Sequence, residues 1–219
     1  MASFLEEKIE AGIFPGARYL VARGAQIRDE GWIGRSVIKP RDLPVGPGTI
    51  YDLASLTKPL VTGALAALLA ARGVLDLMAP VDRYLPELRG GWLGKASIMD
   101  LLVHRSGLAA WLPVYLKAGD RDGYLREISA LSPDYRPGSR VVYSCLGYIL
   151  LTLVLERAGG EGLHLLAEGQ IFSRVGLAQT GYRPPQISSR GLRPPRRGTN
   201  GRGRWPGRRG SAFRGGGEE

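Results

Sequence analysis

The most informative segment of the chain is Asp52-Leu53-Ala54-Ser55-Leu56-Thr57-Lys58-Pro59. It places Ser55 and Lys58 three residues apart, where a long apolar segment begins. Residues i and i+3 of a helix lie on the same face, so a helix here would let Lys58 reach Ser55. A serine hydroxyl is a poor nucleophile until a neighbouring group removes its proton, and a helix N-terminus favours the negative charge that then develops. The stretch therefore contains the ingredients of an acylating serine.

A second Ser-x-x-Lys, Ser36-Val37-Ile38-Lys39, shows that this spacing alone is weak. The pattern is expected by chance about once in a chain of this size. This copy is followed by Pro40 and lies among glycines and prolines, a composition typical of extended chain or loop. In an extended segment the side chains alternate faces, so a serine and a lysine three residues apart point away from each other. We therefore take only Ser55 and Lys58 as a candidate pair.

Length and composition limit the classes of protein and of site. A chain of 219 residues with 44% hydrophobic residues can form one good-sized domain or two small ones. One cysteine excludes a disulfide framework within the chain. Two histidines and that cysteine are too few and too scattered for a His/Cys metal site. We expect neither a metal nor a cofactor.

The N-terminal sequence and the apolar runs bear on location. Residues 1–8 are amphipathic and acidic, without the basic and then apolar pattern of a signal peptide. The longest apolar run, residues 60–71, is 12 residues long and therefore too short to span a bilayer of about 30 Å. We expect a soluble, cytoplasmic protein without a membrane partner.

The positive charge is concentrated at the C-terminal end. Residues 186–219 carry nine arginines against Glu218 and Glu219, so +7 of the net charge of +10 lies there and +3 remains for residues 1–185. The same segment has nine glycines and few apolar residues, a composition that predicts disorder. Arginine- and glycine-rich segments can bind RNA or DNA. The alternative that we favour is an unstructured tail with weak affinity for any polyanion.

Periodicity and turn residues predict the helices and one hairpin. Apolar residues at three- and four-residue spacing between residues 55 and 73 predict a buried, central helix that ends at Gly73. Residues 18–21 and 26–33 are expected to form a hairpin, with a loop over residues 34–50. The other expected helices cover residues 2–12, 98–103, 121–131, 145–157 and 161–173.

The chain resembles a known family in four motifs. Ser55-Leu56-Thr57-Lys58 at the start of an apolar helix is similar to the first motif of the serine beta-lactamases and penicillin-binding proteins, and most similar to the class C enzymes and their esterase and DD-peptidase relatives. Three later stretches resemble the family segments LLTHTSGL, PG…YSNxGY and PLGMxxT, in that order: Asp100 to Leu108, Pro137 to Tyr148, and Val175 to Thr180. The resemblance covers about residues 12–185.

The resemblance implies an α+β fold of the beta-lactamase/DD-peptidase type, with a helical region and an incomplete antiparallel sheet. Residues 1–185 would be the N-terminal part of that domain, and residues 186–219 a disordered Arg/Gly-rich tail. The family's third motif, Lys-Thr-Gly or His-Thr-Gly, does not occur after Tyr143. The expectation is therefore a domain without its C-terminal part.

The resemblance also implies roles for single residues. Ser55 would be the nucleophile, and Lys58 and Tyr143 the pair that moves its proton, with the choice of base between them left open. The reaction would be acyl transfer from an ester, amide or beta-lactam carbonyl of a small molecule. His104 would be structural and not part of a Ser-His-Asp triad.

Cys145 is a candidate substrate-binding residue and also a departure from the family, which has asparagine at this position. A thiol is a weaker hydrogen-bonding group than an amide, so we expect weaker activity on peptides and lactams than on simple esters. Together with the missing third motif, this leaves an alternative open. The chain could be a catalytically impaired remnant of the fold that acts as a binding protein.

Overall fold

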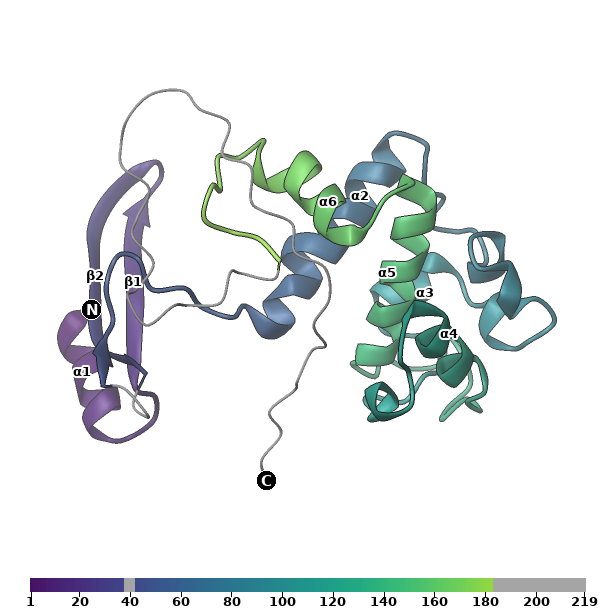
Figure 1. Ribbon diagram of the computed structural model, residues 1–219, viewed down its shortest axis with the longest axis horizontal. Helices are drawn as coiled ribbons and strands as arrows, with labels where there is room; N and C mark the ends of the chain where they lie inside the picture. Colours follow the sequence, from purple (N-terminus) through teal and green to yellow (C-terminus); the bar gives the residue numbers. More distant parts are fainter. Residues whose placement is uncertain (38–41, 183–219) are drawn as a thin grey trace. The chain divides into compact units, whose positions relative to one another are not determined.

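The computed structural model describes residues 1–37 and 42–182, which divide into two compact units, Met1–Ile50 and the part of Tyr51–Gln186 that ends at residue 182 (Figure 1). Each unit is considered by itself. The predicted disordered tail, residues 186–219, lies outside the described residues.

The first unit holds a helix and the predicted hairpin. Helix α1 (Ala2–Glu10) is followed by β1 (Gly16–Arg23) and β2 (Gln26–Val37), which pair antiparallel. Gly24 forms the turn with a φ of 59°, a left-handed conformation that glycine adopts without steric cost. The hairpin is thus confirmed. The predicted loop over residues 34–50 is wrong in part, because β2 continues to Val37 and pairs with the short strand β3 (Leu43–Pro44).

The second Ser-x-x-Lys begins within this hairpin. Ser36 lies in strand β2, and its hydroxyl is 3.2 Å from the carbonyl oxygen of Leu43 and 3.3 Å from that of Pro44. A hydroxyl in this position donates to the neighbouring strand. The extended backbone predicted for Ser36 is confirmed, while Lys39 lies outside the described residues.

The second unit begins with the predicted apolar helix. It opens with a 3₁₀ turn (Ala54–Leu56), continues as a π-helical segment (Lys58–Gly63) and becomes α2 (Ala64–Ala71). We call the whole stretch, residues 54–71, the Ser55 helix. Pro59 has no N–H to donate and is tolerated because it lies within the first turns.

The Ser55 helix is buried on one face only. Val61, Leu65 and Leu69 are buried, whereas Leu56 is 57% and Leu60 52% exposed. The prediction of a buried helix is therefore correct for one face and wrong for the other. Its 18 residues are also long and apolar enough to cross a membrane by length and composition alone, which the 12-residue apolar run did not indicate. The core helix of a soluble protein can pass the same test, so this finding decides nothing about location.

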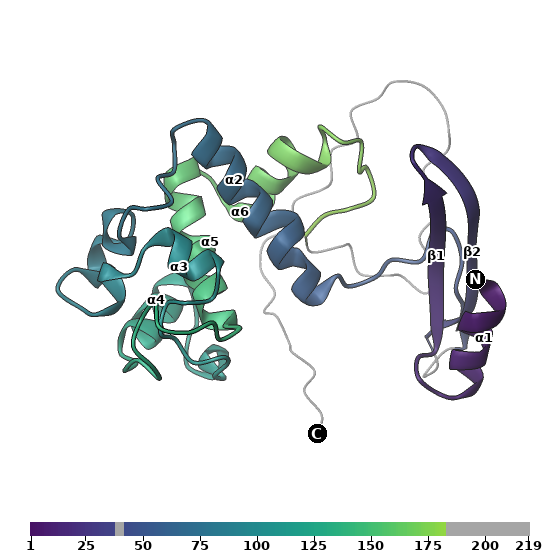
Figure 2. The same cartoon turned by 180° about the vertical axis from the view of Figure 1, so that it is seen from behind.

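Helix α5 (Cys145–Gly159) is the centre of the second unit. It contacts α2, α3 (Ile98–Leu102), α4 (Arg121–Ser129) and α6 (Leu163–Ala167), as Figures 1 and 2 show. The buried residues of α5 are almost all leucine or valine: Leu146, Leu150, Leu151, Leu153, Val154 and Leu155. With the sheet of the first unit, these helices make the predicted α+β fold.

Polar residues fix the ends of these helices. Ser144 caps the N-terminus of α5 by accepting the N–H of Gly147 at 3.2 Å, and Gly160 ends the helix with a φ of 76°. Ser97 and Asp100 form a capping box at α3. Such caps contribute about 0.5–2 kcal/mol each to stability. The Ser144 cap fixes the residue at which α5 begins, and Tyr143 and Cys145 lie on either side of Ser144.

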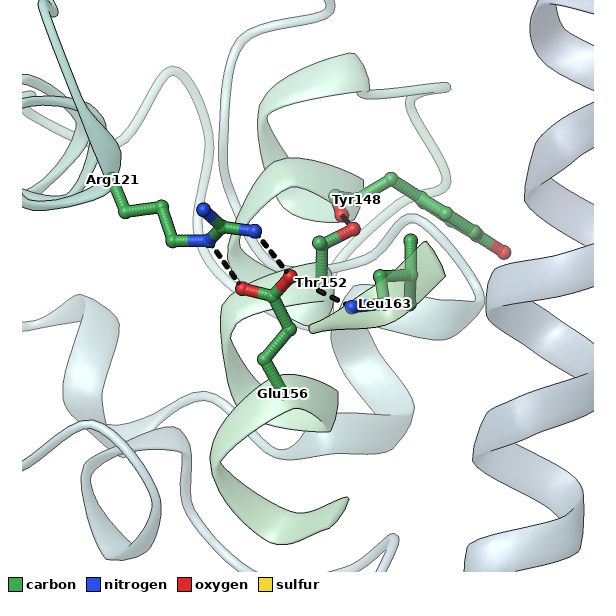
Figure 3. A network of polar contacts seen from close by, with 5 residues as sticks. All are labelled: Arg121, Tyr148, Thr152, Glu156 and Leu163. Carbon is green, nitrogen blue, oxygen red and sulfur yellow. Dashed lines mark hydrogen bonds and ion pairs between the residues drawn. The ribbon is translucent and has the colours of Figure 1, made fainter. Parts of the chain in front are cut away.

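Glu156 joins three helices at the opposite end of α5 (Figure 3). Its carboxylate accepts two hydrogen bonds from the Arg121 guanidinium, at 2.5 and 2.7 Å, and one from the N–H of Leu163, at 2.8 Å. Burial opposes the ionised carboxylate, but the bonds from Arg121 and Leu163 outweigh it and lower the pKa of Glu156. The Arg121 side chain is 61% exposed, whereas Leu163 is buried, so losing the Glu156 carboxylate would leave the N–H of Leu163 without its acceptor.

Glu156→Ala should lower the free energy of unfolding by about 1–3 kcal/mol, the cost of leaving a buried partner unsatisfied. Glu156→Gln should cost less, because its amide oxygen can still accept the N–H of Leu163. The lowered pKa of Glu156 means that its contribution is present above pH 4.5 and is lost as the pH falls through the folded-state pKa. Urea unfolding of the unmodified chain, Glu156→Ala and Glu156→Gln at pH 7 gives the cost of each substitution. The same measurement at pH 4 gives its dependence on pH. Equal loss in the Ala and Gln variants would contradict a stabilising hydrogen bond from the N–H of Leu163 to residue 156.

Candidate active site

A strained turn presents Ser55 at the start of its helix. Ala54, directly before it, has a φ of 43°, a left-handed conformation that costs a residue with a side chain about 1–2 kcal/mol. The turn is held by the Asp52 carboxylate, which accepts the N–H of Ala54 at 2.8 Å. The N–H of Leu56 also donates to the carbonyl oxygen of Leu53 at 2.9 Å. Backbone strain of this kind is found at functional sites, where surrounding contacts maintain it.

Lys58 lies between Ser55 and two tyrosines. Its Nζ donates to Ser55 Oγ at 3.2 Å, as the three-residue spacing predicts. The same Nζ is 5.0 Å from the ring centroid of Tyr143 and 5.8 Å from that of Tyr148. An ammonium within about 6 Å of an aromatic centroid is attracted to the ring. Lys58 therefore connects the Ser55 helix to the start of α5.

Hydrogen bonds of the next residue, Ser144, fix the position of Tyr143. The hydroxyl of Ser144 donates to the carbonyl oxygen of Ala109 at 2.7 Å, while it also caps α5. The N–H of Cys145 donates to the carbonyl oxygen of Ala110 at 2.8 Å. These bonds tie the entrance of α5 to the 109–110 loop and leave the ring of Tyr143 49% exposed, beside Lys58.

The contacts shift the pKa values of Lys58 and Tyr143 in opposite directions. The hydrogen bond from Lys58 and that from Ser55 lower the pKa of Tyr143 from its ordinary value of 10.0. Burial disfavours the Lys58 ammonium, but its interactions with Tyr143 and Cys145 outweigh burial and raise the pKa of Lys58 above 10.5. Lys58 is therefore a persistent cation, and Tyr143 the more readily ionised partner.

Cys145, the candidate substrate-binding residue, lies in the same group. Its half-buried thiol interacts with Lys58, and it is the first residue of α5. The structure thus brings together all four residues singled out from the sequence: Ser55, Lys58, Tyr143 and Cys145. Ser55 and Tyr143 are exposed among the described residues, so the group lies on an open surface and not in the closed cleft that a hydrolase site suggests.

One residue of the site, Tyr148, was not singled out from the sequence. Tyr148 lies three residues after Cys145, a spacing that places both on one face of α5 and could have been recognised. His104 was assigned a structural role, and its ring centroid is 4.7 Å from that of Tyr143 and 4.9 Å from that of Tyr148. Burial and the charge of Lys58 lower the pKa of His104, outweighing the Ser144 backbone, which acts in the opposite direction.

The chain is similar in sequence to known proteins. A family model described as Beta-lactamase matches residues 1–218. Esterase EstB of Burkholderia gladioli is 36% identical over 190 residues, which are 76% of this chain and 47% of the relative. N-acetylmuramyl-L-alanine amidase of Bacillus subtilis (strain 168) is 31% identical over 201 residues, 83% of this chain and 45% of the relative.

Solved structures give the same result for the fold. A class C beta-lactamase from Rhodobacter sphaeroides is 32% identical, with a TM-score of 0.68, over 80% of this chain and 48% of that one. A beta-lactamase/D-alanine carboxypeptidase from Pseudomonas syringae is 24% identical, with a TM-score of 0.74, over 84% and 51%; it shows likeness of fold alone. The chain spans about half the length of the curated relatives that it matches.

Proposed function

The chain belongs to the beta-lactamase family, and we propose that it is a serine hydrolase that acts through an acyl-enzyme on an ester, amide or lactam carbonyl. One observation carries the proposal. Ser55 Oγ lies 3.2 Å from Lys58 Nζ, and both interact with a Tyr143 phenol whose pKa is lowered. A nucleophile beside a group able to take its proton is the arrangement that acyl transfer requires.

The directions of the pKa shifts favour Tyr143 over Lys58 as the base. We infer that the Tyr143 phenolate takes the proton of Ser55 as Ser55 Oγ bonds to the substrate carbonyl carbon. Lys58 stays protonated and stabilises the phenolate. Tyr143 then returns the proton to the leaving oxygen or nitrogen as the bond to it breaks, which leaves an ester on Ser55. Water adds to that ester with the same proton transfers, and release of the acid regenerates the serine.

The backbone N–H of Ser55 supplies one donor for the negative charge on the carbonyl oxygen. Ser55 lies in the first turn of an 18-residue helix, where backbone N–H groups lack a partner within the helix. Such donors act where charge develops in the transition state. Removing a single donor of this kind costs about 10²–10³ in rate in a serine protease.

Simple esters are the substrate class that we propose first. The relatives include an esterase, a beta-lactamase and an amidase, and the first of these is 36% identical. Cys145 favours the same choice, because a thiol holds the amide of a peptide or lactam poorly. Ester hydrolysis also needs less help with its leaving group, since an alcohol leaves more easily than an amine.

Cys145→Asn should increase acylation by a penicillin about fivefold, because one added hydrogen bond contributes roughly 1 kcal/mol. Hydrolysis of a p-nitrophenyl ester should change less, since that substrate has no amide to hold. The rate of penicilloyl adduct formation, followed by intact mass, gives the comparison. Cys145→Ser is the control for removing the thiol without adding an amide. An equal gain in the Ser variant would contradict substrate binding at this position.

Hydrolysis of p-nitrophenyl acetate by the purified chain tests the proposal directly. We expect turnover that is lost in Ser55→Ala and kept in Ser36→Ala, the variant of the second Ser-x-x-Lys. Turnover that survives the loss of Ser55 would refute the assignment.

A non-enzymatic binding protein of the same family is the second candidate. It is favoured by one observation: no Lys-Thr-Gly or His-Thr-Gly follows Tyr143 in the 219 residues. This candidate predicts a folded chain that neither hydrolyses esters nor forms an adduct with a fluorophosphonate. Turnover that requires Ser55 would exclude it. Weak polyanion binding by residues 186–219 remains a separate proposal, tested by the salt dependence of binding with and without that segment.

A further inference from the structure

His104 holds the backbone on both sides of Tyr143. Its carbonyl oxygen accepts the N–H of Val142 at 2.9 Å. Its ring Nδ1 accepts the N–H of Ser144 at 3.1 Å. Tyr143 is the single residue between these two bonds, so one histidine fixes the segment from which the phenol projects toward Lys58.

The side-chain bond defines the state of the ring. A histidine nitrogen can accept a hydrogen bond only when it carries no proton. The N–H of Ser144 therefore requires a neutral His104 whose proton lies on Nε2. A protonated ring would present an N–H to another N–H, and the bond on the Ser144 side of Tyr143 would be lost.

The packing of His104 supports this role. Its ring lies against the rings of Tyr143 and Tyr148, with centroids 4.7 and 4.9 Å away. Its carbonyl oxygen accepts a further hydrogen bond from the Tyr135 hydroxyl at 3.2 Å. The residue has a φ of 59°, in the left-handed region that few residues other than glycine adopt and in which histidine is enriched along with asparagine and aspartate. His104 is thus held from several sides in the conformation that makes both bonds.

We propose that His104 is a positioning residue for Tyr143: the neutral ring holds the phenol beside Lys58, and protonation of the ring releases it. The catalytic consequence rests on the proposed hydrolase function, whereas the effect on Tyr143 does not. The residue acts on the reaction only through Tyr143.

Charged and titratable groups around His104 keep it neutral near pH 7. Lys58 faces it across the tyrosine rings, and Tyr143, Tyr148 and Tyr135 surround it. The neighbouring Arg105 turns its guanidinium to the carbonyl oxygen of Gly138. Burial and the positive charge of Lys58 lower the pKa of His104 below 6.5. Release of Tyr143 is therefore expected only in acid.

Two variants separate the hydrogen bond from the backbone conformation. Asparagine and glycine both tolerate a positive φ. His104→Asn places an amide oxygen near the position of Nδ1 and cannot titrate, whereas His104→Gly removes the acceptor. His164, the other histidine of the chain, gives the control variant His164→Asn.

The readout is the pKa of the Tyr143 phenol, measured by NMR on a chain with ¹³C-labelled tyrosine and assigned by Tyr143→Phe. We expect a lowered pKa in the unmodified chain, in His104→Asn and in His164→Asn. In His104→Gly it should rise toward 10, because the phenol is no longer held beside Lys58. In the unmodified chain the Tyr143 signal should also shift in acid with the midpoint of the His104 ring, and this shift should be absent from His104→Asn.

Ester hydrolysis gives a second, independent comparison. His104→Gly should lower kcat/KM about 10²-fold, the cost of a small misplacement of a catalytic group. His104→Asn should stay within about threefold of the unmodified chain, which corresponds to about 0.65 kcal/mol where tenfold is 1.4 kcal/mol. In the unmodified chain, part of the fall of kcat/KM at acid pH should follow protonation of the His104 ring. This part should be absent from His104→Asn.

An unchanged Tyr143 pKa in His104→Gly, or an Asn variant that behaves like the Gly variant, would overturn the proposal. If His104→Gly does not fold, the acid shift of Tyr143 in the unmodified chain and its loss in His104→Asn decide the matter alone. A chain with the expected Tyr143 response and no ester turnover would support positioning while removing the hydrolase function. Ester turnover without the expected Tyr143 response would support the hydrolase function and refute positioning by His104.

Discussion

Ser55→Ala should abolish hydrolysis of p-nitrophenyl acetate, with a loss on the order of 10⁶-fold where the assay can follow it, as removal of the nucleophile does in a serine protease. The reason is chemical: alanine has no oxygen to bond to the substrate carbon, so the acyl-enzyme cannot form. Lys58 and Tyr143 would remain in place but would have no proton to move. Steady-state rates at pH 8, measured against a reaction without protein, provide the test.

The matched control is Ser36→Ala, which removes the hydroxyl of the second Ser-x-x-Lys. Ser36 lies in a strand and bonds to the neighbouring strand, so its loss should leave turnover unchanged. Because Ser55 is exposed, Ser55→Ala should shift the free energy of unfolding by no more than about 0.5 kcal/mol. Equal rates in Ser55→Ala and the unmodified chain would contradict the nucleophile assignment.

Lys58→Met should lower kcat about 10²–10⁴-fold, the range for loss of a group that assists proton transfer. Methionine preserves the length of the side chain without its charge. Without the ammonium, the pKa of Tyr143 should return upward toward 10.0, since Lys58 is the largest cause of its lowering. Activity that needs the phenolate rises as Tyr143 loses its proton. The acid limb of the rate profile should therefore move to higher pH in this variant.

The pH profile of kcat/KM between pH 5 and 10 distinguishes the two possible bases. If Tyr143 is the base, the limb moves up in Lys58→Met and the residual rate recovers in alkali. If Lys58 itself were the base, the variant would show no recovery at any pH. Tyr143→Phe is the matched variant, in which the Tyr143-dependent limb should disappear.

Much of the fold follows from local patterns in the sequence. The caps at Ser144 and Ser97 and the stop at Gly160 are side-chain and backbone signals that act within a few residues. Helices α3, α4 and α5 accordingly lie within two residues of their predicted bounds. The hairpin was predictable for the same reason, because Gly24 permits its turn.

Features that depend on distant contacts were not predictable. The short strand β3 exists because β2 extends far enough to pair with it, and two residues carry too little periodicity to show this. Leu60 is apolar like its neighbours, so the sequence does not show that its side chain is exposed. Its exposure depends on which face of the Ser55 helix packs against α5. The π-helical segment after Lys58 likewise has no simple sequence signal.

In the candidate site, too, local contacts were predictable from the sequence and distant ones were not. The spacing of Ser55 and Lys58 predicts their contact, because three residues make almost one helical turn. The approach of Tyr143 was implied by the family resemblance, since nothing local places residue 143 beside residue 58. His104 was expected to be structural, but its bonds to Val142 and Ser144 could not be predicted, because they join segments about 40 residues apart.

The most direct test of the account is the site at which a fluorophosphonate attaches to the unmodified chain, determined by intact mass and peptide mapping. Attack by an activated serine predicts one adduct per chain, on the peptide that contains Ser55, and a rate that falls in Lys58→Met and in Tyr143→Phe. An adduct on another residue, no adduct on the folded chain, or the same rate in all three proteins would contradict it.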